Sequence, residues 1–397
     1  MSRSATVRSV RSACRIIKRL MSFEPGGWED CRSFGRGALR EILEQRMRGQ
    51  LQKVLALEVA EGVQDRRNGQ YRRHLLTGMG DIELSVPRTR RFSAMQLVQA
   101  YARRSPDVDR AVLACFVLGL STRKVAEALL PMLGESVSAS TVSRVTRTLD
   151  EAVAAFHRRA LVNRYRVLLF DGVVLSRKTG AGAQKRPVLV VLGILPNGRK
   201  EVIDFLLAPA ESQVAWEGFL NDLYRRGLTG DGVEQITTDG GTGLLAALPL
   251  VYPRIPVQRC WAHKVRNVLD KVREKDKAAI RTALRRIYRA PNRGKACEQA
   301  LRLAVRWEDR YPAAVRCLMK DLEELLTFFA FEDPEWRRKV RTTNAIERRF
   351  LEVRRRTRPM GVFSDRTSIE RILFAVFMHE NRKQGTAGPF PLMTQKS

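Results

Sequence analysis

Three acidic residues, far apart in the sequence, stand where carboxylates serve chemistry better than packing: Asp171, Asp239 and Glu347. Asp171 interrupts the apolar segment 167–175, Asp239 follows the segment 233–238, and Glu347 precedes a run of arginines. Carboxylates can hold two divalent cations about 3.5 to 4 Å apart, one activating the attacking oxygen of a phosphodiester reaction and the other stabilising the leaving oxygen. The three acids are therefore candidate catalytic residues and candidate ligands of two Mg²⁺ ions, for which Mn²⁺ would substitute.

Each acid also has a structural explanation. An Asp-Gly pair between apolar residues is a strong signal for a two-residue hairpin turn, so Asp171-Gly172 is evenly balanced between turn and site. Asp239 could be an ordinary turn aspartate, and Glu347, three residues after Asn344, could complete a capping box. The arginines that follow Glu347 favour a site beside a phosphate backbone, and we expect four of them to bind DNA. These are Arg348, Arg354, Arg355 and Arg358.

The composition indicates a globular protein with a polyanionic partner. The 397 residues include 72 Lys and Arg against 42 Asp and Glu, a formal charge of +30, which points first to nucleic acid. No apolar run reaches the roughly 18 residues of a membrane span. The six cysteines form no Cys-x-x-Cys pair, which indicates a reducing, cytoplasmic location. Residues 1–22 resemble a transit peptide in composition, but a flexible basic tail is the favoured interpretation.

The N-terminal half reads as mostly helical. Residues 23–105 predict one or two helices over 37–61 and a hairpin from 71–76 and 82–86. Residues 106–160 have helix-turn-helix spacing: one helix to Gly119, a second over 121–130, and a third from about Ser138 or Ser140 into the 150s. The third helix carries side chains that suit base edges and phosphates, although a plain helical bundle would fit too. These predicted DNA-binding residues are Ser140, Thr141, Arg144 and Arg147.

The C-terminal half predicts an α/β domain. Residues 161–270 contain strand patterns at 167–175, 187–195 and 202–207, then an amphipathic helix, a short strand at 233–237 and another near Val257. Three hairpin-linked strands followed by alternating helix and strand are the order of a ribonuclease-H-like fold. Residues 271–340 predict an all-helical insertion, residues 341–383 the C-terminal helices with the last acid, and residues 384–397 a flexible tail.

Four blocks of the chain resemble the mutator-type insertion-sequence transposases of bacteria. They are Asp171-Gly172-Val173, Thr238-Asp239-Gly240, the segment 257–269 with its Cys-x-x-His, and the Thr-Thr-Asn-x-x-Glu-Arg of 341–348. The segment 354–363 adds to the resemblance, which spans roughly residues 28–383. It implies a ribonuclease-H-like catalytic domain in which Asp171, Asp239 and Glu347 form an Asp-Asp-Glu triad. It also implies metal-dependent strand cleavage and transfer at the terminal inverted repeats, and a homodimer that brings two double-stranded ends together.

The Cys-x-x-His block has alternatives of its own. Cys260 and His263 have the spacing of half a zinc site, but no second pair lies nearby in the sequence. The resemblance implies no structural metal there, so we expect Cys260 to pack against the active site and His263 to contact DNA or the carboxylates. Arg259 and Lys264 are predicted DNA contacts, and Trp261 is predicted to stack on an unpaired base unless it is a core residue.

Two other functions fit parts of the sequence. A DNA-binding regulator with structural acids would explain the charge and the helix-turn-helix pattern, and it would have no metal-dependent activity. A repair or junction nuclease on the same fold would cleave DNA without joining it.

Overall fold

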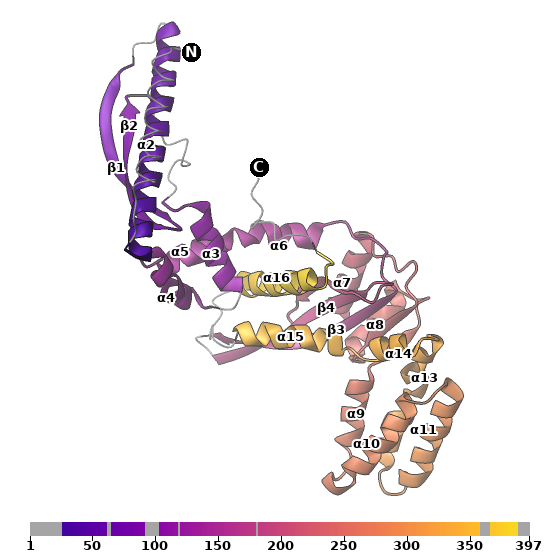
Figure 1. The fold of residues 1–397 in the computed structure, drawn as a ribbon. Coiled ribbons are helices and arrows are strands. Elements are labelled where there is room, and N and C mark those ends of the chain that lie inside the picture. The colour runs from indigo at the N-terminus through magenta and orange to yellow at the C-terminus, as the bar shows by residue number, and fades with distance from the viewer. Residues whose placement is uncertain are drawn as a thin grey trace. The chain divides into compact units, whose positions relative to one another are not determined.

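The computed structural model describes residues 26–61, 65–91, 103–117, 120–179, 182–357 and 366–387 (Figure 1). Compact contacts divide the chain into two units, Met1–Arg147 and Thr148–Ser397. The tail predicted for 1–22 and the predicted DNA contact Arg358 lie outside the described residues, as do 388–397 of the second tail. No described helix is both long and apolar enough to cross a membrane, and the five described cysteines are free.

Unit 1 begins with a long helix and a two-stranded sheet, as the hydrophobic pattern predicts. Helix α2 (Trp28–Ala60) is a single helix that starts earlier than expected. Strands β1 (Arg67–Thr77) and β2 (Gly80–Thr89) pair antiparallel around a turn at Gly78 and Met79. One face of the hairpin packs on α2, with Met47 against Leu75 and Leu84. The predicted helices and hairpin are therefore confirmed.

Three short helices follow in unit 1: α3 (Pro106–Val117), α4 (Thr122–Leu133) and α5 (Ala139–Arg147). The side chain of Ser121 accepts a hydrogen bond from the backbone of Lys124 at 3.3 Å and begins α4. The side chain of Ser138 accepts a hydrogen bond from the backbone N–H of Thr141 at 3.2 Å and caps the start of α5. On α5, Val142, Val145 and Thr146 are buried, whereas Ser140, Arg144 and Arg147 are exposed and Thr141 is half-buried.

The third predicted helix does not run unbroken into the 150s. It ends at Arg147, and a separate helix, α6 (Leu149–Arg158), belongs to unit 2. Packing explains the break, because α6 is held by its own partners: the Phe156 ring lies 6.1 Å from that of Phe205 and 5.3 Å from that of Phe374.

The core of unit 2 is a five-stranded mixed sheet in the order β5-β4-β3-β6-β7. Its strands are β3 (Val167–Thr179), β4 (Gly182–Ile194), β5 (Lys200–Leu207), β6 (Gln235–Thr238) and β7 (Val257–Arg259). β3, β4 and β5 pair antiparallel, and β6 and β7 add in parallel beside β3. The predicted strand order is confirmed, with β3 and β4 longer than expected.

Helices cover both faces of this sheet. Alternate residues of the strands point to opposite faces, so Phe170, Leu189 and Ile203 pack on one side against α7 (Gln213–Arg225) and α8 (Thr242–Val251). On the other side, Phe205 meets Phe377 of α16 (Arg366–Lys383), and α15 (Asn344–Thr357) contacts β3. The sheet is therefore the buried middle layer of unit 2.

Between β7 and α15 the chain is entirely helical or turn, as predicted, with no strand in residues 260–343. The segments are α9 (Trp261–Leu269), α10 (Glu274–Tyr288), α11 (Arg293–Trp307), α12 (Pro312–Met319), α13 (Leu322–Leu325), the 3₁₀ turn η2 (Thr327–Ala330) and α14 (Pro334–Val340).

Candidate active site

Asp171 lies inside β3 and not at a turn. It pairs with Val190 of β4 in a register that continues without interruption to Thr179 and Gly182, eight residues beyond Asp171. The hairpin-turn interpretation of Asp171-Gly172 is therefore wrong. The Asp171 side chain is only 3% exposed. A buried carboxylate in mid-strand requires a partner.

Asp239 comes directly after β6 and is placed beside Asp171 by strand pairing. β6 runs parallel to β3 with Thr238 opposite Phe170, so both acids lie at the same point along neighbouring strands. Asp239 Oδ1 accepts a hydrogen bond from the backbone N–H of Gly241 at 3.0 Å and another from the Thr238 hydroxyl at 3.2 Å. These bonds hold the carboxylate at the carboxyl end of the strand, where ligands of α/β sheets commonly bind.

Glu347 is brought to the same place by the return of the chain from the helical insertion. The carbonyl of Val340 accepts hydrogen bonds from Thr237 Oγ1 at 2.6 Å and Gln235 Nε2 at 3.2 Å, both on β6. The backbone N–H of Trp261 donates to the carbonyl of Arg341 at 3.0 Å. Helix α15 therefore begins beside β6, and Glu347 lies in its first turn.

Glu347 faces the Cys-x-x-His block. Its Oε1 lies 3.5 Å from Nε2 of His263, and its side chain is 39% exposed. Because α15 already begins at Asn344, and the carbonyl of Thr343 accepts from the N–H of Ile346 at 2.8 Å, a capping box based on Asn344 does not account for the glutamate. The carboxylate is directed to the acid cluster instead.

The three acids interact electrostatically. Burial, and next the charge of Asp239, raise the pKa of Asp171 to about 7, while a hydrogen bond from Thr343 and the charge of His263 act in the opposite direction. Asp171 Oδ2 is buried and has no hydrogen-bond partner. A buried carboxylate oxygen without a hydrogen-bond partner, under the charge of a second carboxylate, is suited to binding a cation.

Cys260 and His263 lie between the second and third acids. The buried Cys260 sulfur accepts from the backbone N–H of Thr343 at 3.3 Å and from its hydroxyl at 3.5 Å, so it joins the start of α9 to the start of α15. The adjoining Cys260 side chain, and next the charges of Asp171 and Asp239, raise the pKa of His263 to about 9 against the effect of burial. No hydrogen bond of good geometry reaches His263 Nδ1, which is buried.

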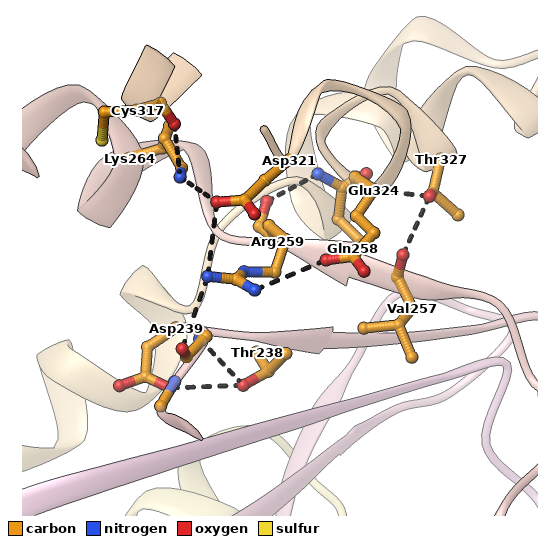
Figure 2. A network of polar contacts seen from close by, with 12 residues as sticks. Thr238, Asp239, Val257, Gln258, Arg259, Lys264, Cys317, Asp321, Glu324 and Thr327 are labelled. Carbon is orange, nitrogen blue, oxygen red and sulfur yellow. Dashed lines mark hydrogen bonds and ion pairs between the residues drawn. The ribbon is translucent and has the colours of Figure 1, made fainter. Parts of the chain in front are cut away.

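A network of charged residues supports the turn that carries Asp239 (Figure 2). The guanidinium of Arg259 lies against Gly240 and donates to its carbonyl at 3.4 Å, and it pairs with Asp321 at 3.6 Å and Glu324 at 3.5 Å. Lys264 Nζ bonds to the same Asp321. The described contacts of Arg259 are thus all within the protein.

Two predicted DNA contacts are corrected by burial. Trp261 is 1% exposed, its indole N–H donates to the carbonyl of Leu325 at 2.7 Å, and it has no free face for a base. Lys264 is 5% exposed and also donates to the carbonyl of Cys317 at 3.0 Å. Both residues fix α9 to the helical insertion, which a pattern of local spacing cannot reveal.

Three arginines of α15 that were predicted to bind DNA are at the surface, whereas Arg349 and Arg356 of the same helix are buried. Arg348, Arg354 and Arg355 are exposed, and Arg355 pairs with Glu352 at 2.6 Å. Surface arginines of this kind can bind phosphates at little cost, because an exposed ion pair within the helix is weak.

Comparison with known proteins identifies the chain. The sequence model described as "Transposase, Mutator family" matches residues 26–385. The chain belongs to the Mutator family of transposases. It is 31% identical to the transposase for insertion sequence element IS905 of Lactococcus lactis over 361 residues, 90% of this chain and 91% of the relative. The transposase for IS1081 of Mycobacterium tuberculosis is 33% identical (80% and 76%), and that for IS256 in transposon Tn4001 of Staphylococcus aureus 31% identical (81% and 82%).

The donor atoms of this transposase fit a divalent cation such as Mg²⁺. Asp171 and Asp239 supply hard oxygen ligands, and Asp171 Oδ2 has no other partner. Within the described residues no group of three His, Cys, Asp or Glu side chains is already close enough to hold an ion. Mg²⁺ usually binds proteins through one or two carboxylates, waters and the phosphates of the substrate, so a pair of acids with a third nearby is sufficient.

Sequence reasoning missed one acid of the transposase site. Glu211 precedes α7, and its Oε1 would lie 3.2 Å from a Cβ placed on Gly241, close to Asp239. Burial, and next the charge of Asp239, raise the pKa of Glu211. The signal that could have found it is the one used for Asp239, an acid shortly after the carboxyl end of a strand, here β5.

Proposed function

We propose that this transposase cleaves and joins DNA strands at the terminal inverted repeats of its insertion sequence, using an Asp-Asp-Glu centre that requires Mg²⁺ or Mn²⁺. The observation that carries the proposal is the juxtaposition of two acids on neighbouring parallel strands, one buried with an unsatisfied oxygen, with Glu347 across His263 from them. The order of the sheet, three antiparallel strands with two parallel strands added, supports a ribonuclease-H-like catalytic domain.

The acidic side chains of the site and His263 would have different roles in this reaction. Two divalent ions, when bound, would activate a water or a DNA 3′-hydroxyl for attack and stabilise the leaving oxygen. Asp171, within β3, and Asp239, at the end of the adjacent β6, would bind them, and the mutual repulsion of the two carboxylates makes the site attract cations. His263, whose Nε2 lies 3.5 Å from Oε1 of Glu347, would orient that carboxylate.

DNA binding is assigned to exposed basic surfaces of each unit. In unit 1, the capped helices α4 and α5 have the spacing of a helix-turn-helix, and the exposed Ser140, Arg144 and Arg147 share one side of α5. In unit 2, the exposed Arg348 and Arg354 follow Glu347 along α15. A homodimer would present one active site to each end of the element.

A strand-transfer assay tests the proposal. Wild-type protein with Mg²⁺ or Mn²⁺ should nick DNA that carries the sequences flanking its own gene and join the released 3′ ends to a target. Asp171→Asn, Asp239→Asn and Glu347→Gln should bind the same DNA but neither nick nor join. Cleavage without joining by the wild type would favour a non-transposing nuclease, and full activity of the three variants would exclude the triad.

The regulator hypothesis receives less support. A protein that only binds DNA has no use for a carboxylate that is 3% exposed, partly unsatisfied and repelled by a neighbour. Such an arrangement lowers stability and is typical of a site that binds a charged ligand or performs chemistry.

A further inference from the structure

Glu211 occupies a place that the three acids do not explain. It lies between the end of β5 and Ser212, whose hydroxyl begins α7 by accepting from the N–H of Ala215 at 3.3 Å. The residue is exposed overall, but its carboxylate turns back over the sheet. A methyl group on Gly172, the neighbour of Asp171, would overlap Glu211 Oε1. Only a residue without a side chain lets the carboxylate come so near to β3.

The same carboxylate also reaches Asp239. A Cβ on Gly241 would lie 3.2 Å from Glu211 Oε1, 3.6 Å from Asp239 Oδ1 and 3.9 Å from Asp239 Oδ2. The two carboxylates therefore flank one small space above Gly241. Consecutive residues of a strand face opposite sides of a sheet, so Asp171 approaches from one side of β3 and Glu211, over Gly172, from the other. Asp239, at the end of the next strand, is adjacent to both.

A buried oxygen of Asp171 is available to a cation. Asp171 is 3% exposed, its Oδ2 has no hydrogen-bond partner, and the charge of Asp239 acts on it. On the other side of the strand, the indole N–H of the buried Trp216 lies near the Glu211 carboxylate and favours its charged form, while burial and Asp239 raise the pKa of Glu211. Buried groups are rarely left unsatisfied in this way unless something else completes the site.

We propose that Glu211 is a fourth carboxylate of the metal site and shares one of two divalent ions with Asp239, while Asp171 and Asp239 share the other. The proposal rests on the metal-dependent function proposed above. It assigns a role to Gly172 and Gly241 as well, since their missing side chains leave room for the Glu211 carboxylate. Hard oxygen donors on both sides of Asp239 suit Mg²⁺ or Mn²⁺.

The test is the binding of Mn²⁺ to the full chain without DNA, measured by electron paramagnetic resonance of the free ion. The wild type is expected to bind two ions per chain. Glu211→Gln should lose one of them or bind it at least about 10-fold more weakly. The matched control is Glu217→Gln, the same change on α7 itself, which should bind Mn²⁺ as the wild type does.

A second variant moves the carboxylate without removing it. In Gly172→Ala the added methyl group would displace the end of the flexible Glu211 side chain, so the strand can keep its place and the acid its charge. This variant should weaken the same ion as Glu211→Gln does. Circular dichroism of both variants checks that they fold.

The outcomes separate this proposal from the one on which it rests. Weakened binding of one ion in both Glu211→Gln and Gly172→Ala, with Glu217→Gln unchanged, supports the fourth carboxylate. Wild-type binding in those two variants, together with loss of binding in Asp239→Asn, overturns the fourth carboxylate alone. Wild-type binding in Asp239→Asn overturns both proposals.

Discussion

Replacing Asp171 by asparagine should stabilise the metal-free protein at neutral and alkaline pH. The carboxyl pKa is about 7 in the folded protein, raised from 3.8 by burial and by Asp239. The folded state therefore holds the proton more tightly than the unfolded state does. This favours folding at low pH, and the benefit is lost as the pH rises from about 4 to about 7. Asparagine has no carboxyl group to ionise, so Asp171→Asn lacks this loss of stability as the pH rises.

The magnitude follows from the size of the shift. About three pKa units correspond to about 4 kcal/mol, so the stability of Asp171→Asn relative to wild type should rise by about that amount between pH 4 and pH 8. The other groups that face Asp171 are Asp239, Glu347, His263 and the Thr343 hydroxyl, and they are present in both proteins. Because the charge of Asp171 also raises the pKa of His263, the pH-dependent difference reports the Asp171 carboxyl together with its effect on these neighbours.

The assay is urea unfolding in the presence of a chelator, followed by circular dichroism at several pH values. Glu217→Gln, a change of charge on α7, serves as the control and should show no comparable dependence on pH. If the unfolding free energies of Asp171→Asn and wild type ran parallel from pH 4 to pH 8, Asp171 would have an ordinary pKa, and the buried, repelled carboxylate described above would be wrong.

Three further predictions concern the surroundings of the site. Arg348→Ala should weaken binding to all DNA sequences alike and lower the salt dependence by about one unit in a filter-binding series; an unchanged slope would mean that this arginine contacts no phosphate. The double change Ser140→Ala and Arg144→Ala should reduce the preference for end sequences over random DNA in competition assays, and a retained preference would remove α5 from recognition. In Asp321→Asn, Arg259 and Lys264 lose the carboxylate that they share, which should lower the unfolding free energy by about 3 kcal/mol. Glu324→Gln, at an exposed ion pair with Arg259, should lower the unfolding free energy by under about 1 kcal/mol. If both variants lost the same unfolding free energy, Asp321 would not be the buried centre of the network.

Much of the fold was predictable because its signals are local. Short runs of consecutive apolar residues mark β3 and β4, and serine caps mark the starts of α4 and α5, so these elements were placed within a few residues. The break at Thr148 was not predictable, because the helical pattern continues across it. The packing of α6 within unit 2 depends on Phe205 and Phe374, which lie far away in the sequence.

In the candidate site, too, residues with local sequence signals were predicted, and roles that depend on distant contacts were not. Asp171 was found because it interrupts an apolar strand and Asp239 because strand ends collect ligands, and pairing of β3 with β6 brings them together. Trp261 and Lys264 were assigned to DNA because the local sequence is basic, whereas the insertion folds back over them through Asp321 and Leu325. Glu211 was missed because its neighbours at the site come from two other strand ends.

The central claim is that acids from three distant segments surround one metal site, and cleavage of the protein backbone by bound iron tests it most directly. Fe²⁺ with ascorbate and peroxide, in place of Mg²⁺, generates radicals that cut the chain near the ion. The account predicts cuts close to residues 171, 239 and 347 in the same protein, all of them suppressed by excess Mg²⁺ and absent in Asp239→Asn. Cuts confined to one of these segments, or unchanged cuts in Asp239→Asn, would contradict it.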